Sequence, residues 1–187
     1  MIRLFVALLA AQLCIVGPAR AQQQPPDLTR FRAFADPFVG AWAVRIRDLD
    51  QNGNVTWEGN QRRVVSYTIA NEFLEERALV HSQRQNSDIV AGLHLISYAP
   101  ARNELVQQGY WPGQAGILFH VRASLSTDNR RADGTIEMPG ETGIRRQRRL
   151  EIVWRSADEL HYRTFARSPE GAEYLNEELV YRRVAGS

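Results

Sequence analysis

The chain has 187 residues, with 23 basic and 21 acidic side chains and a formal net charge of +2. Loss of residues 1–21 as a signal peptide would remove Arg3 and Arg20 and no acid, leaving 21 side chains of each sign. This balance excludes a general electrostatic attraction to nucleic acid or to an anionic membrane, so neither is an expected partner.

Residues 1–21 have the pattern of a cleaved signal peptide. Arg3 precedes an apolar segment over 4–16, and Ala19-Arg20-Ala21 is a small-x-small cleavage pattern. The apolar segment is shorter than the roughly 20 residues that span a bilayer, so we expect no stable membrane insertion after cleavage following Ala21. Cys14, the only cysteine, lies inside this segment, so the mature chain has no disulfide or thiolate chemistry.

The basic residues are all Arg, and the chain contains no Lys. This usage suggests GC-rich codons and a bacterial source. Together with the signal peptide, it predicts a periplasmic or secreted protein.

Residues 22–37 are expected to form a leader and one short helix, because Leu28, Phe31 and Phe34 share a helical face. From 38 to 187 we expect one domain, built from runs that alternate apolar and polar residues between turn signals. The predicted strands are Val39–Asp48, Trp57–Ile69, Glu72–Ser82, Ile89–Tyr98, Glu104–Trp111, Ile117–Ser126, Gly134–Met138, Ile144–Arg155, Glu159–Arg167 and Tyr174–Val184.

Short loops between successive strands imply antiparallel neighbours. A meander of this kind has exposed edges unless it closes on itself. The sequence therefore predicts an all-β fold, a single antiparallel up-and-down β-barrel of about ten strands with a short N-terminal helix across one end. A two-sheet sandwich is the alternative.

Closure of the barrel would bring the first and last strands together. Trp42 follows Gly40 in the first, and Tyr181-Arg182-Arg183 ends the last. We expect one of these Arg side chains to stack on the Trp42 ring, a cation–π contact of about 0.5–2 kcal/mol. Gly40 would allow a close backbone approach at the barrel floor.

Gly40-x-Trp42 on the first strand, with Tyr181-Arg182-Arg183 on the last, resembles the lipocalin and fatty-acid-binding (calycin) superfamily of barrels. The segment 96–111 is similar to one bacterial branch, the uncharacterised lipocalin-like family DUF1579, through Tyr98, Pro100 and Arg102. Ala99 stands where that family commonly has Asp. The resemblance implies a lipocalin-like barrel with a ligand cavity, and it implies no reaction.

Alternation within the strands predicts which side chains face inward. The expected inward sets are Val65, Tyr67 and Ile69; Ile117, Phe119, Val121 and Leu125; Ile136 and Met138; and Leu150, Ile152 and Trp154 with Arg148 and Arg146. In the fourth strand, Ile89, Ala91, Leu93 and Leu95 compete with Val90, His94, Ile96 and Tyr98. One of Tyr110 and Trp111 must also face inward.

Seven residues are candidates for contact with a ligand in the barrel. Trp42, Tyr67, Phe119 and Trp154 are expected to form an apolar wall, and Arg148 and Tyr181 to hold a polar head group. His94 is the most plausible titratable group inside. Alternatively, Arg148 pairs with an internal Glu or faces water at the rim.

Motifs for known chemistry are missing. The four His residues show neither HxH nor HExxH spacing, so we expect no metal, and the glycine-rich entry motif of a haem-binding relative is missing, so no cofactor is expected. There is no G-x-S-x-G elbow. Glu75-Glu76 and Glu177-Glu178 are strand neighbours that point to opposite faces and are interpreted as solvated and lid-facing charges rather than an acid–base pair.

Three hypotheses follow. The first is an exported barrel that binds a small apolar or amphipathic molecule. The second is an enzyme, such as an isomerase, cyclase or hydrolase, that uses the same cavity with His94 or a nearby Glu as base. The third is a structural or interaction module of the envelope with a filled core.

Overall fold

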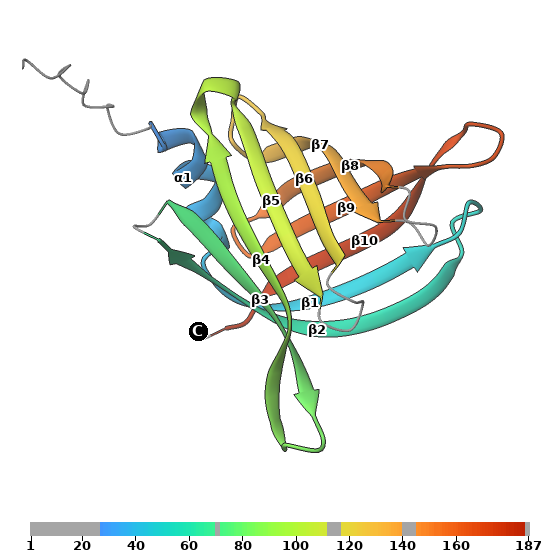
Figure 1. The fold of residues 1–187 in the computed structure, drawn as a ribbon, viewed down its shortest axis with the longest axis horizontal. Helices are drawn as coiled ribbons and strands as arrows, with labels where there is room; N and C mark the ends of the chain where they lie inside the picture. Colours follow the sequence, from blue (N-terminus) through green and yellow to red (C-terminus); the bar gives the residue numbers. More distant parts are fainter. Residues whose placement is uncertain (1–26, 70–71, 112–116, 140–144, 186–187) are drawn as a thin grey trace, which may run out of the picture.

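Ten runs of alternating side chains form ten strands that close into a barrel. The computed structural model describes residues 27–69, 72–111, 117–139 and 145–185, and within them each strand pairs antiparallel with its neighbours in the chain. β1 pairs with β10 and closes the sheet (Figure 1). The expected up-and-down barrel is therefore confirmed, and the sandwich is excluded.

The element boundaries lie close to those expected. The elements are α1 (Thr29–Ala35), η1 (Asp36–Phe38, a 3-10 helix), β1 (Gly40–Leu49), β2 (Val55–Thr68), β3 (Phe73–Ser82), β4 (Ser87–Ala99), η2 (Pro100–Arg102, a 3-10 turn), β5 (Glu104–Trp111), β6 (Ile117–Leu125), β7 (Arg131–Pro139), β8 (Arg145–Ser156), β9 (Glu159–Arg167) and β10 (Glu173–Arg183). The largest difference is at β7, which begins at Arg131 rather than Gly134. Residues 1–21 lie outside the described residues, so the signal peptide stays a prediction.

The contact between the first and last strands is the one expected. Trp42 is the register partner of Arg183, whose guanidinium carbon lies 4.4 Å from the centre of the Trp42 ring. The same guanidinium donates to the carbonyl oxygen of Val39 at 3.0 Å. Gly40 has φ +135°, and a Cβ there would lie 2.8 Å from Arg183 Nη1. Glycine at this position therefore makes room for the Arg183 side chain.

The short helix covers one end of the barrel (Figure 1). Phe31, Phe34 and Phe38 are buried in the core that the strands form. Trp42 Nε1 donates to the carbonyl oxygen of Phe38 at 2.8 Å, and Trp154 Nε1 donates to that of Phe34 at 3.0 Å. The helix and the two indoles together form a packed plug, which closes this end of the barrel.

No helix among the described residues is long and apolar enough to span a membrane.

Most inward-facing side chains follow the predicted alternation. Val65, Phe119, Val121, Leu125, Ile136, Leu150, Ile152 and Trp154 are buried in one core. Ile69 is a correction: it has φ +45° and is 62% exposed, because the chain has already left β2 and entered a turn. In β4 the inward set is the one containing His94 and Ile96. In β5 Tyr110 is 42% exposed.

The wall of the barrel divides between β2 and β3. The β2–β3 ladder runs from Thr68 opposite Phe73 only as far as Arg62 opposite Leu79, whereas β2 continues along β1 to Val55. A register shift between Ala78 and Leu79 turns the outer half of the β3–β4 hairpin away. In Figure 1 this hairpin projects from the barrel. Two strand edges therefore diverge at this point.

Candidate functional site

A cavity of about 620 Å³ occupies the interior of the barrel away from the helical plug. The described residues that line it are Ile46, Asp48, Leu49, Thr56, Trp57, Gln61, Arg63, His94, Gln107, Phe119, Ile136, Met138, Pro139, Arg148, Tyr162, Asn176, Glu177, Leu179 and Tyr181. Its volume is within the range of about 300–1,000 Å³ that is typical of small-molecule sites. Apolar side chains make up much of the wall, and the polar ones gather in two groups.

The first polar group is a buried hydrogen-bonded cluster at the floor. Arg63 Nη1 donates to Glu76 Oε1 at 2.8 Å and to Tyr181 Oη at 2.5 Å. The Tyr181 hydroxyl donates to the same Glu76 oxygen at 2.9 Å. The other carboxylate oxygen lies 2.7 Å from His94 Nδ1, and Gln107 Nε2 lies 3.3 Å from that nitrogen. The side chains of Arg63, Glu76 and His94 are 3%, 1% and 4% exposed, so water does not screen them.

Charge pairing fixes the ionisation of this cluster. Burial alone would raise the pKa of Glu76, but the Arg63 guanidinium and His94 outweigh it and hold the pKa well below its usual range. Burial likewise raises the pKa of the Tyr181 hydroxyl. Glu76 is therefore a carboxylate and Tyr181 a neutral donor at any ordinary pH. A buried ion pair of this kind stays charged because each partner satisfies the other.

His94 connects the cluster to the cavity. Its imidazole is held by the Glu76 carboxylate and meets the Phe119 ring edge to face, with centroids 4.9 Å apart. A carboxylate that holds one ring nitrogen fixes the orientation of the imidazole. The arrangement therefore presents His94 to the cavity in one orientation, suited to a hydrogen bond or a proton transfer with a bound molecule.

The second polar group is on the cavity wall, where β1 meets β10. Asp48 and Glu177 are direct register partners, a position in which side chains come within contact distance. Burial and the charge of Asp48 raise the pKa of Glu177, and burial also raises the pKa of Asp48. Arg148 favours the charged form of both carboxyl groups. The three side chains form a partly neutralised cluster, in which Arg148 faces two internal acids.

Four of the seven predicted site residues line the cavity: His94, Phe119, Arg148 and Tyr181. Trp42, Tyr67 and Trp154 are not among the described lining residues and lie at the closed end of the barrel. A void of only about 20 Å³ separates the plug from Glu76, Gln107, Tyr162 and Tyr181, so the floor cluster lies between the cavity and the plug. Alternation predicts which face a side chain is on, but not how far along the barrel it lies.

Trp42, Tyr67 and Trp154 have structural partners at the closed end of the barrel. Trp42 and Trp154 pack together with centroids 5.9 Å apart, and both indoles donate to the helical segment. The Tyr67 hydroxyl donates to the Asp36 carboxylate. The Arg32 guanidinium carbon lies 5.3 Å from the Tyr67 ring centre. These contacts hold the plug in place.

The interpretation of Glu76 as a solvated charge was wrong. It alternates with Leu74 and Ala78, both buried, so the pattern of β3 already points it inward. Arg63 alternates in the same way with Val65. The sequence signal was an Arg and a Glu on the inward faces of neighbouring strands, and each supplies the partner that makes burial of the other possible.

No protein-family model matches the chain, and no curated protein matches it. Among solved structures it is similar to Rv2717c from M. tuberculosis, with 15% identity and a TM-score of 0.52 over 84% of this chain and 96% of that one. It is also similar to the S-type phycobiliprotein lyase CPES from Guillardia theta, with 11% identity and a TM-score of 0.53 over 88% and 99%. Likeness at this identity shows the fold alone, a closed antiparallel β-barrel. Membership of DUF1579 stays a prediction.

Proposed function

We propose that this protein is an exported barrel that binds one small amphipathic molecule in its interior. The observation that carries the proposal is the cavity of about 620 Å³, which combines an apolar wall with a hydrogen-bonding floor. A cavity of this size favours binding over a filled core. Export rests on the sequence of residues 1–21.

The lining suggests how the ligand lies. Phe119, Ile136, Met138 and Leu179 offer apolar contact, while His94 and Gln107 at the floor offer hydrogen bonds. A molecule with an apolar body and a polar end would place that end on the floor. The Arg148 guanidinium offers a second contact for an acidic group of the ligand. Asp48 and Glu177 face the same guanidinium and would weaken that contact by competing for it.

A fluorescence titration tests the proposal. Anilinonaphthalene sulfonate serves as the reporter, and decanoate, decylamine and decanol compete with it, so that only the head group differs among the competitors. Met138→Trp fills the cavity and should weaken reporter binding by at least about ten-fold. Glu137→Trp, on the opposite face of β7, is the matched control and should change it less than about two-fold. Equal binding by all three proteins would contradict an interior site.

The role of Arg148 has its own test. Arg148→Ala should weaken decanoate relative to decanol, because a guanidinium binds a carboxylate and not a neutral hydroxyl with a charge-assisted bond. If the two competitors keep their wild-type ratio, the head group lies elsewhere in the cavity.

The His94–Glu76 hydrogen bond of 2.7 Å favours a second candidate, an enzyme that uses His94 as general base in the same cavity. NMR titration of the His94 ring, with and without decanoate, separates the two functions. A His94 ring that titrates near neutral pH, and whose NMR signals shift when decanoate binds, supports a role as general base. If the ring shows neither response, His94 does not act as a base and the binding function is favoured.

A further inference from the structure

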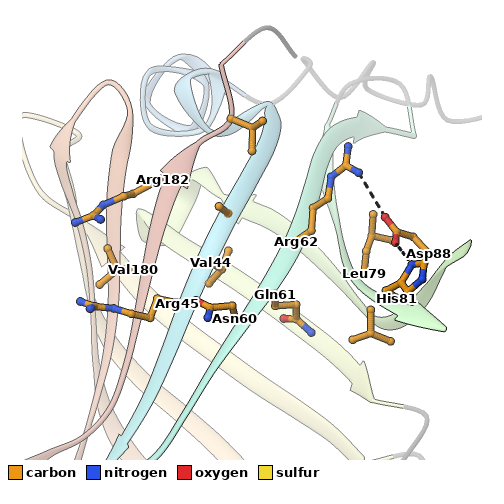
Figure 2. Close-up of a pocket in the computed structure, with 13 residues that line it drawn as sticks. Val44, Arg45, Asn60, Gln61, Arg62, Leu79, His81, Asp88, Val180 and Arg182 are labelled. Carbon is orange, nitrogen blue, oxygen red and sulfur yellow. Dashed lines mark hydrogen bonds and ion pairs between the residues drawn. The ribbon is translucent and has the colours of Figure 1, made fainter. Parts of the chain in front are cut away.

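The outer face of the barrel carries a groove whose described lining shares only Gln61 with that of the interior cavity. Its volume is about 650 Å³, and it lies between β10, β1 and β2 on one side and the projecting β3–β4 hairpin on the other (Figure 2). The described lining residues are Ala43, Val44, Arg45, Asn60, Gln61, Arg62, Leu79, Val80, His81, Asp88, Val180, Arg182 and Val184. The interior site does not account for this groove.

One side of the groove is an unpaired strand edge. Residues 55–61 of β2 pair with β1, but the β2–β3 ladder stops at Arg62 opposite Leu79. The backbone amides and carbonyls of 55–61 that point away from β1 therefore have no ladder partner among the described residues. Such an edge accepts another strand by ordinary sheet hydrogen bonding.

The opposite side is the hairpin, of which Leu79, Val80, His81 and Asp88 line the groove. Val80 is 39% exposed, and Ile89, opposite Val80 in the ladder, is 37% exposed. A two-stranded hairpin without further packing is marginally stable in water. An additional strand in the groove would cover these side chains and extend the sheet from β2.

The charge of the groove indicates the composition of that strand. Arg182, Ala43 and Arg62 are cross-strand neighbours in one row, and Arg45 lies on the same face of β1. Figure 2 shows the three Arg side chains around the groove. The only acid in the described lining is Asp88, which lies 3.4 Å from Arg62. Arg182 has a carboxylate neighbour outside the groove, Glu159, at 3.3 Å.

We propose that this groove binds an extended segment of a partner protein, with acidic and apolar residues in alternation, as a strand added to the free edge of β2. Backbone hydrogen bonds to 55–61 supply the affinity. Alternate side chains would face the barrel surface, where Arg45, Arg62 and Arg182 meet carboxylates and Leu79 and Val80 of the hairpin meet apolar groups.

The test uses the purified protein and a fluorescein-labelled peptide of eight residues that alternates Glu and Val, about the length of one strand. Three control peptides separate the contributions. One replaces Glu by Lys, one carries an N-methyl group on every residue and so cannot donate backbone hydrogen bonds along either edge, and one alternates Glu and Gly. We expect binding of the Glu–Val peptide and at least about ten-fold weaker binding of all three controls.

Hydrogen exchange locates the site. With the peptide bound, amides within 55–61 and 79–82 should exchange more slowly, and amides of β6 and β7 should not change. Arg45→Glu should weaken binding about ten-fold. Arg122→Glu makes the same change of charge at an exposed outward position on β6 and should have little effect. Met138→Trp should not affect the peptide, which separates this test from that of the interior site.

Several outcomes would overturn the proposal. Equal binding of the N-methylated peptide would exclude strand addition. Self-association of the protein that protects 55–61 without peptide would show that a second copy takes the edge. Binding of anionic phosphatidylglycerol vesicles through Arg45, with no binding of the peptide, would assign the groove to a lipid surface.

Discussion

The buried ion pair at the cavity floor makes a quantitative prediction about stability. Glu76→Gln keeps the shape of the side chain and removes its charge. Arg63, whose side chain is 3% exposed, then has no carboxylate in the floor cluster to balance it. The substitution therefore tests whether the cluster is held by charge rather than by shape.

The expected loss follows from the contacts. Glu76 makes three charge-assisted hydrogen bonds, to Arg63 at 2.8 Å, to Tyr181 at 2.9 Å and to His94 at 2.7 Å. Replacing a charged acceptor by a neutral one costs about 1–1.5 kcal/mol per bond. The total is about 3–5 kcal/mol, which matches the usual cost of removing one partner from a buried pair. Since domains are stable by about 5–15 kcal/mol, the variant should fold but unfold much more easily.

Urea unfolding followed by Trp fluorescence measures this loss by linear extrapolation. Glu75→Gln is the matched control, because Glu75 immediately precedes Glu76 in β3 and points to the outer face. There it pairs with Arg77, and an ion pair at such a position contributes about 0–1 kcal/mol. Adding Arg63→Met to Glu76→Gln should recover part of the loss, because the unbalanced charge is gone. A Glu76→Gln loss no larger than that of Glu75→Gln would refute the reasoning.

Three further predictions concern the same barrel. Arg183→Ala should lower the free energy of unfolding by about 2–3 kcal/mol, because it removes the Trp42 contact and hydrogen bonds to backbone carbonyls at the closure. Gly134→Ala should cost about 3 kcal/mol or more in the same urea assay, because its Cβ would lie 1.9 Å from the Arg122 carbonyl oxygen. Glu177→Gln should raise the melting temperature at pH 8 and leave it unchanged at pH 4, as measured by calorimetry.

The raised pKa of Glu177 makes its ionised form destabilising in the folded state. The folded state binds this proton more tightly than the unfolded chain, so stability falls as pH rises from the unfolded pKa through the folded one. Glu173→Gln, at an exposed position of β10, should not alter this dependence. Arg182→Ala and Thr135→Ala are the corresponding surface controls for Arg183 and Gly134. A Glu177→Gln variant less stable than wild type at pH 8 would contradict the assignment, as would variants of Arg183 or Gly134 that match their controls.

The fold was predictable because each strand carries its own pattern. The period of two along Trp42, Val44 and Ile46, and again along Leu150, Ile152 and Trp154, predicts strands and their inward faces. Short turns make successive strands antiparallel neighbours, and closing the sheet into a barrel then removes its exposed edges. The Arg183–Trp42 contact was also predictable, because closure requires the first and last strands to be neighbours.

The site was less predictable, because it depends on position along the barrel axis. Trp42 and Phe119 both face inward, yet one packs in the plug and the other lines the cavity. That difference depends on the stagger between strands, which local periodicity does not encode. The burial of Glu76 was missed because a charge is favourable inside only beside its partner, and pairing of β2 with β3 supplies Arg63.

The most direct test of the central claim is native mass spectrometry of the protein purified gently from its own source. The interior-binding account predicts one discrete additional mass per chain that is lost on denaturation and is missing from Met138→Trp but present in Glu137→Trp. Its formula should be that of a small amphipathic molecule. A protein that carries no additional mass across growth conditions, and that binds no reporter when one is added, would contradict the account.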